Sequence, residues 1–141
     1  MVEIQWSEEG PTVEEYVALR QAAGLSPKSR AAASRGLRGS LYALVGRTPE
    51  GQALAMGRVI GDRGAFFEIV DMAVRPEVQG QGLGTAVMTR LMDYIAREAP
   101  PTAAVMLLAD VPADRLYAKF GFRPTAPASL GMIYVVGRQA E

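Results

Sequence analysis

The chain has 141 residues, is 49% hydrophobic and carries 15 basic and 15 acidic residues, so its formal net charge is zero. This length and hydrophobic content predict a single domain, residues 1–141, with a buried core. The zero net charge gives no electrostatic basis for binding nucleic acid or an anionic membrane, and no apolar run is long enough to span a bilayer. The acidic start of the chain has no apolar signal segment, so we expect a cytoplasmic protein.

The sequence contains no cysteine and no histidine. Their absence excludes disulfides, thiolate nucleophiles, cysteine zinc sites and the Ser-His-Asp triad. We therefore expect no metal site. Any proton transfer must use Asp, Glu, Tyr, Lys, a chain terminus or water.

The first half of the chain alternates between strand and helix signals. A short strand is predicted at residues 2–6, and Thr12 and Gly24 are the start and stop signals of a helix over residues 12–23. A second helix is predicted at residues 27–36, with Ser26 as its cap. Apolar runs then predict three strands, at residues 41–47, 53–60 and 66–74.

The second half reads as a crossover followed by two short elements. Apolar residues at helical spacing predict a helix from residue 83 to about residue 98, before two prolines that cannot continue it. A buried strand is predicted at residues 103–109, a helix at 113–120 and a last strand at 132–136. This order predicts an α/β (α+β) domain whose sheet is antiparallel first and partly parallel later.

Three alternating glycines, Gly80, Gly82 and Gly84, lie between the strand at 66–74 and the long helix. The unpaired N–H groups and the dipole of a helix N-terminus favour an anion there, and glycines let the backbone approach a phosphate. The pattern is neither a Walker loop, which needs a lysine, nor the dinucleotide motif, which spaces its glycines differently. A tight turn with no ligand remains the alternative.

The segment "QGQGLG" at residues 79–84 fits the Arg/Gln-x-x-Gly-x-Gly/Ala signature of the GCN5-related N-acetyltransferase (GNAT) family. The segment "LYAKFGFRPT" at residues 116–125 resembles a second motif of that family, in which Leu-Tyr precedes Gly-Phe. This resemblance covers the whole chain. It implies the GNAT fold, with a mixed sheet of about 6–7 strands and about four helices.

The resemblance implies that acetyl-CoA is the co-substrate and donates its acetyl group to an amine. Backbone N–H groups of the glycine segment would hold the pyrophosphate, and the strand before it would pair with the pantetheine arm. Asp110 stands where the family often has Asn, and an ionised Asp accepts hydrogen bonds but donates none. The implied cofactor-binding residues are Met72, Ala73, Val74, Gln79, Gly80, Gln81, Gly82, Leu83, Gly84, Thr85, Asp110 and Ala113.

Three residues are candidates for catalysis. Tyr117 matches the family tyrosine that protonates the leaving thiolate, and a neutral phenol suits that role. It is alternatively a core tyrosine, or it only orients the cofactor sulfur. Glu68 and Asp71 are candidate bases for the incoming ammonium; strict alternation puts them on opposite faces, and a bulge would bring both toward the cleft. Either carboxylate could instead pair with an arginine, and a water chain could replace both.

The implied activity is an acetyl-CoA-dependent N-acetyltransferase, a transferase of the acyltransferase class, acting on a primary amine of a small molecule. Two alternatives stay open: a CoA-binding module without turnover, and an acyltransferase that uses a longer acyl-CoA or a carrier-protein thioester. A homodimer is a candidate assembly, because dimers are common in the family. Aromatic residues are candidates for the acceptor site, among them Tyr16, Tyr42, Phe66 and Phe67.

Overall fold

The computed structural model describes residues 2–137. The chain divides into two compact units, Met1–Leu107 and Leu108–Glu141. The first unit contains a five-stranded sheet and three of the four α-helices found in the described residues. None of the helices in residues 2–137 combines the length and the hydropathy needed to cross a membrane.

The sheet follows chain order, β1-β2-β3-β4-β5, as its strands pair successively. The first three pairings are antiparallel and the last, β4 with β5, is parallel. The mixed α/β class is therefore confirmed, and the described residues contain five strands where about six or seven were expected. The strands are β1 (Gln5–Ser7), β2 (Tyr42–Arg47), β3 (Ala53–Gly61), β4 (Phe66–Val74) and β5 (Ala104–Met106).

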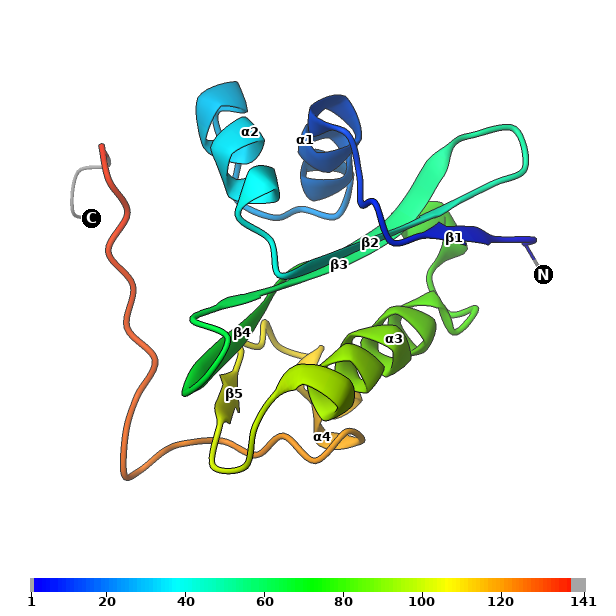
Figure 1. The fold of residues 1–141 in the computed structure, drawn as a ribbon. Helices are drawn as coiled ribbons and strands as arrows, with labels where there is room; N and C mark the ends of the chain where they lie inside the picture. Colours follow the sequence, from blue (N-terminus) through cyan, green and yellow to red (C-terminus); the bar gives the residue numbers. More distant parts are fainter. Residues whose placement is uncertain (1, 138–141) are drawn as a thin grey trace. The chain divides into compact units, whose positions relative to one another are not determined.

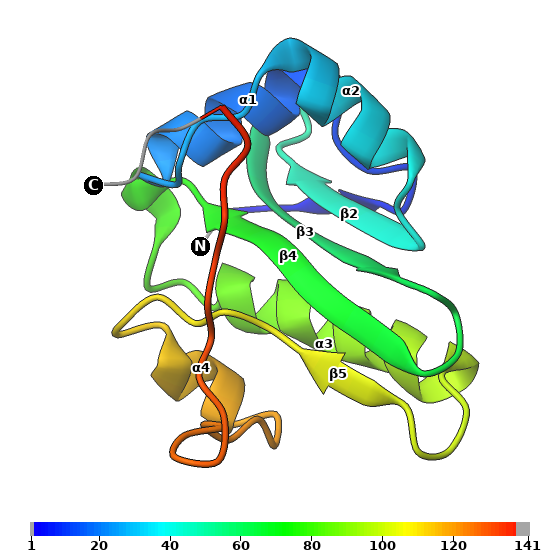
Figure 2. The same ribbon diagram turned by 90° about the vertical axis from the view of Figure 1, so that its left-hand side faces the viewer.

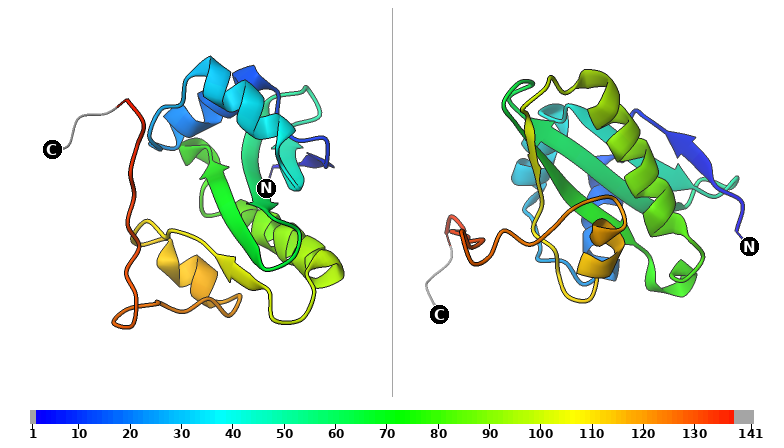
Figure 3. Two further views of the ribbon diagram at one scale, coloured as in Figure 1. Left: turned by 60° about the vertical axis from the view of Figure 1, so that its left-hand side comes forward. Right: turned by 90° about the horizontal axis from the view of Figure 1, so that it is seen from below.

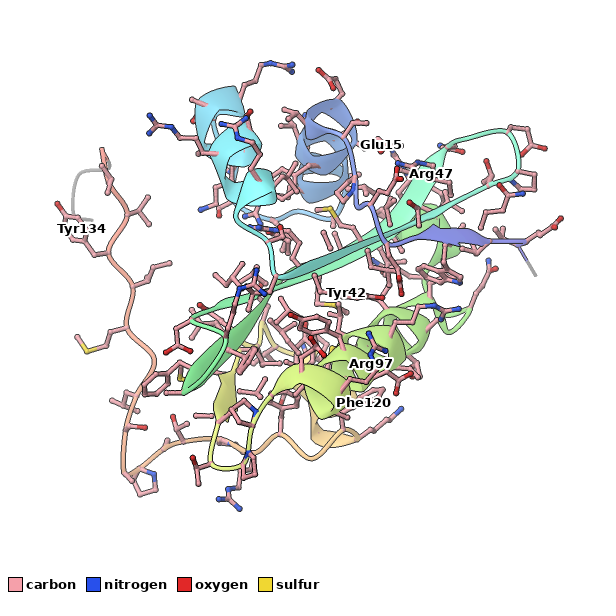
Figure 4. The ribbon with its side chains drawn as sticks, in the orientation of Figure 1. Glu15, Tyr42, Arg47, Arg97, Phe120 and Tyr134 are labelled. Atoms are coloured by element: carbon pink, nitrogen blue, oxygen red, sulfur yellow. The ribbon has the colours of Figure 1, made fainter. Side chains whose placement is uncertain are left out.

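Two helices cover one face of this sheet and one helix covers the other (Figures 1 and 3). Helices α1 (Val13–Ala22) and α2 (Arg30–Arg38) lie on the first face, and α3 (Leu83–Glu98) lies on the second. A half-buried ion pair helps to dock α1: Arg47 of β2 donates from Nε to Glu15 at 2.7 Å, as Figure 4 shows.

Helix α3 packs closely on the sheet because the residue of β3 that faces it, Gly57, has no side chain. A Cβ built on Gly57 would lie 2.7 Å from Cγ1 of Val87 and 3.0 Å from Cδ1 of Leu91, both in α3. A side chain there would push the helix away from the sheet. The six residues of α3 that are buried are Leu83, Val87, Met88, Leu91, Tyr94 and Ile95.

All the predicted elements of the first unit occur, but several bounds differ: β1 covers residues 5–7 instead of 2–6, and α2 covers residues 30–38 instead of 27–36. The cap of α2 is Ser29, whose hydroxyl accepts from the N–H of Ala32, and not Ser26. The strand expected at residues 103–109 is shortened to Ala104–Met106, because only these residues pair with β4. A short 3₁₀ helix, η1 (Pro76–Val78), follows β4 and was not predicted.

The second unit contains α4 (Asp114–Ala118), within the helix expected at residues 113–120. The strand expected at residues 132–136 was wrong: within residues 119–137 the structure has no strand. The apolar side chains of that segment are exposed, Tyr134 at 88%. Sequence alone suggests a strand there because Ile, Tyr and Val favour extended backbone, whereas a strand also needs a hydrogen-bonding neighbour.

Candidate functional site

Strand β4 contains a β-bulge at Asp71 and Met72. Its register with β3 runs regularly from Phe67 to Val70, shifts opposite Gly57, and resumes at Ala73. Two residues of β4 therefore oppose one residue of β3, and Asp71 takes the left-handed conformation with φ of 60°. The bulge that would reconcile the two acidic residues is thus present.

The bulge places Glu68 and Asp71 on the same face of the sheet. Val70 lies directly opposite Arg58, whose side chain reaches α2, so Val70 and Glu68 share the α1–α2 face. Asp71 also points to that face, because it accepts hydrogen bonds from α1. Phe67 alternates with Glu68 and therefore lies on the opposite, α3 face of the sheet.

Strand β4 leaves one edge open beyond β5. The parallel pairing with β5 covers only Phe66 to Glu68, and Figure 2 shows β4 continuing past it. The N–H of Arg75 donates to Leu54 of β3, so by alternation the backbone of Ala73 also faces β3. Met72 and Val74 consequently present their backbone groups at the open edge, and Ala73 does not.

The glycine segment follows this open edge directly. Gly80 and Gly82 adopt φ of 81° and 82°, and Gly82 caps α3 at Leu83. Only glycine takes this conformation without a steric cost, which explains two of the three glycines. Gly84 and Thr85 lie inside the first turn of the helix.

The backbone N–H groups of residues 80–85 have no hydrogen-bond acceptor within residues 2–137. The next N–H along the chain, that of Ala86, donates to the carbonyl of Gly82. The side chains of the two glutamines in this segment form hydrogen bonds. Gln79 donates to the carbonyl of Val74, and Gln81 accepts from the N–H of Val2. Six consecutive donors at a helix N-terminus fit an anionic group.

Asp71 is the acceptor of a buried cluster. Its side chain is 4% exposed and receives Nη1 of Arg20, Nε of Arg58 at 2.8 Å and the hydroxyl of Tyr16 at 2.9 Å. The ring of Tyr16 lies near both guanidiniums, 5.9 Å from Arg20 and 5.8 Å from Arg58. Burial and the Asp71 charge raise the pKa of Tyr16, so its phenol stays protonated as a donor.

The carboxylates of Asp71 and Glu68 therefore differ in their hydrogen-bond partners. Asp71 already accepts three hydrogen bonds, two of them from cations. Glu68 is half-buried, and within residues 2–137 its carboxylate forms no hydrogen bond and no ion pair. Of the pair, Glu68 is the one whose oxygens are available to a ligand.

Sequence reasoning missed Arg20 and Arg58. A signal for Arg58 was present, because it is a charged residue inside the apolar run of β3. Tyr42, an aromatic candidate for the acceptor site, lies on the α3 side, where its ring stacks on Tyr94 with centroids 5.0 Å apart (Figure 4). Tyr16 does lie on the α1–α2 face.

The second unit holds the remaining predicted residues. The ring of Tyr117 in α4 packs edge-to-face on Phe122, and burial together with the charge of Asp110 raises the pKa of Tyr117. The carbonyl of Ala113 accepts from the N–H groups of Leu116 and Tyr117, and that of Asp110 accepts from Ala113. Ala113 and Asp110 therefore begin the turn that carries Tyr117.

Comparison with known proteins identifies this arrangement. The model of the acetyltransferase (GNAT) family matches residues 4–122. A protein of unknown function from meticillin-resistant Staphylococcus aureus, described as a probable acetyltransferase, is 44% identical, with a TM-score of 0.90 over 94% of this chain and 99% of that one. A protein from Xanthomonas campestris assigned to the GNAT family is 27% identical, with a TM-score of 0.76 over 97% of this chain and 96% of that one.

A more distant structure shows the fold alone. Glucosamine-6-phosphate N-acetyltransferase from Arabidopsis thaliana is 18% identical, with a TM-score of 0.70 over 95% of this chain and 99% of that one. No protein with a curated description matches the chain. The family model spans most of the sequence, and the GNAT fold expected from the glycine segment and the Leu-Tyr segment is confirmed. The chain belongs to the GNAT acetyltransferase family.

Proposed function

We propose that the chain transfers an acetyl group from acetyl-CoA to the primary amine of a small molecule, with residues 1–141 acting as one catalytic domain. The observation that carries this proposal is the run of six N–H groups at residues 80–85 that have no acceptor within residues 2–137, a few residues after an open strand edge. A diphosphate needs the first feature and an extended amide-bearing arm needs the second.

The donor would bind mainly to the main chain. The pyrophosphate would lie on the backbone N–H groups of residues 80–85, because the N–H of Gln79 already donates to Pro76. The pantetheine amides would pair with the backbone of Met72 and Val74 as an added strand, in place of the Gln79 side chain on the Val74 carbonyl. Ala73 would contribute only indirectly, by connecting Met72 and Val74, because its own backbone groups face β3. Asp110 and Ala113 are proposed to contact the cofactor arm.

The chemistry needs one base and one acid. The ammonium of the acceptor loses a proton to Glu68, its nitrogen attacks the thioester carbonyl carbon, and the C–S bond breaks. Tyr117 gives its proton to the departing CoA thiolate. The attacking nitrogen then loses its second proton, which restores the Tyr117 hydroxyl through water, and Glu68 releases the first proton to solvent. We propose Glu68 as the base because its carboxylate is unpartnered in residues 2–137, and we assign Asp71 the positioning of Arg20 and Arg58.

The first experiment is a measurement of CoA release. The full chain is mixed with acetyl-CoA and a panel of polyamines, arylalkylamines, aminoglycosides, amino acids and peptides, and free thiol is followed. Release that depends on one amine class supports the proposal. Tight binding of acetyl-CoA without release from any amine favours the module without turnover, and release only from longer acyl-CoA favours the other alternative.

Substituting Gly82 tests the donor site. In Gly82→Ala a Cβ must occupy the left-handed region, which costs about 1–2 kcal/mol, so the loop relaxes and its N–H groups turn away. We expect acetyl-CoA to bind about tenfold more weakly by calorimetry. Gly24→Ala is the matched control, because Gly24 has φ of 77° and open space around it. Equal affinities for the two variants would contradict the assignment.

Substituting Tyr117 tests the acid. Tyr117→Phe removes only the hydroxyl, so kcat should fall by roughly 10²–10⁴-fold while the dissociation constant of acetyl-CoA stays the same. Because burial and the charge of Asp110 raise the pKa of Tyr117, any loss of rate from deprotonation of this phenol should begin at a higher pH than the pKa of a free tyrosine would give. Tyr134→Phe, which alters an exposed tyrosine of the same unit, is the control. An unchanged kcat in Tyr117→Phe would exclude the role.

Substituting Glu68 tests the base through its pH dependence. Glu68→Gln should lower kcat/KM at pH 7 by roughly 10²–10⁴-fold. The loss should shrink as the pH rises through the pKa of the acceptor amine, because a neutral amine needs no base. Glu77→Gln, an exposed glutamate of η1, is the control. A loss that is the same at every pH would show a structural role, and no loss would favour a water chain.

A further inference from the structure

The α1–α2 face of the sheet buries more positive than negative charge. Arg20 and Arg58 are 8% and 7% exposed, and both turn to the single carboxylate of Asp71. Two guanidiniums against one carboxylate leave one positive charge uncompensated within this cluster. Buried charges are expensive without a partner, so the excess calls for an explanation.

The donors of Arg58 show where the excess lies. Its Nε donates to Asp71, and its Nη1 donates to the carbonyl of Gly36 at 2.7 Å and to the hydroxyl of Ser40 at 2.9 Å. Its Nη2 donates to no acceptor within residues 2–137. These residues contain no unpartnered side-chain nitrogen or oxygen that is sealed from solvent, so Nη2 is reachable from outside.

Arg20 differs in this respect. Its Nε and Nη2 both donate to Ser26, in the connection between α1 and α2, and its Nη1 donates to Asp71. Every nitrogen of Arg20 is thus used to hold the helices on the sheet. Docking the helices also uses Nε and Nη1 of Arg58, and it leaves Nη2 with two N–H donors to spare.

Arg58 lies next to Glu68 on this face. Arg58 is opposite Val70 in the register of β3 and β4, and Glu68 is two residues before Val70. Such diagonal neighbours have Cα atoms about 7–8 Å apart. Within residues 2–137, a carboxylate and a guanidinium nitrogen that both lack a hydrogen-bond partner therefore belong to neighbouring positions on one face of the sheet.

We propose that the acceptor is an amine that also carries an anionic oxygen group, a carboxylate or a phosphate. The anionic group binds Nη2 of Arg58, and the ammonium faces Glu68, which takes its proton. This inference rests on the proposed acetyl transfer and names the chemical class of its acceptor. The two N–H groups of Nη2 can donate charge-assisted hydrogen bonds to the oxygens of either anion, and the contacts of Nε and Nη1 hold the guanidinium in place before the ligand arrives.

The test compares matched amines that differ only in the anionic group. Glycine is compared with glycinamide, and phosphoethanolamine with ethanolamine, by calorimetric titration of the full chain at pH 7. The anionic member of one pair should bind on the order of 10- to 100-fold more tightly. Preference in the glycine pair indicates a carboxylate, and preference in the phosphoethanolamine pair indicates a phosphate.

Variants assign that preference to a residue. Arg58→Met should abolish it, so that the two members of each pair bind alike, and Arg58→Lys, which keeps the charge on a single nitrogen, should reduce it in part. Arg47→Met is the matched control, because Arg47 is also ion-paired on the α1 side and should keep the full preference. If Arg58→Met fails to fold, Arg58→Lys and the unmodified chain decide.

Equal affinity for both members of each pair in the unmodified chain overturns the proposal, and so does a preference that both Arg58 variants retain. The binding measurement does not depend on turnover. A preference that the Arg58 variants lose, in a chain that releases no CoA with any amine, would therefore support the anion site and contradict the acetyl transfer. CoA release that does not depend on the anionic group of the amine would support the acetyl transfer and contradict the anion site.

Discussion

The ionic contact of Asp71 with Arg20 and Arg58 is the interaction on which the α1–α2 side of the first unit depends. Removing the carboxylate would leave two guanidiniums buried with no counter-charge, which is far more costly than losing an exposed ion pair. Asp71 also takes a left-handed backbone conformation that non-glycine residues avoid. The contact thus holds the helices on the sheet and the bulge in its strand.

The bulge has consequences on two sides of β4. It brings Asp71 to the same face as Glu68, so the charged groups collect under α1 and α2. It also shifts the alternation of the backbone, so that Met72 and Val74 present their N–H and C=O groups at the edge that β5 leaves open. One extra residue in a strand therefore changes both the main-chain groups at the strand edge and the side chains on one face of the sheet.

The two proposed subsites differ in how they bind negative charge. Residues 80–85 offer backbone N–H groups, which any residue could supply as long as the glycines allow the turn. Arg58 offers a side chain, anchored by Gly36 and Ser40, at one position of one strand. A donor shared by a whole family suits the first kind of site, and an acceptor particular to one protein suits the second.

The sequence by itself determined the elements whose signals are local. Periodicity and backbone preference over a few neighbouring residues predict the bounds of β4 and α3, the cap at Thr12 and the glycine segment. Only the tertiary structure decided that Asp71 joins two distant arginines while Glu68 has no partner among residues 2–137, and that residues 132–136 form no strand. These outcomes depend on partners far along the chain, which no local pattern encodes.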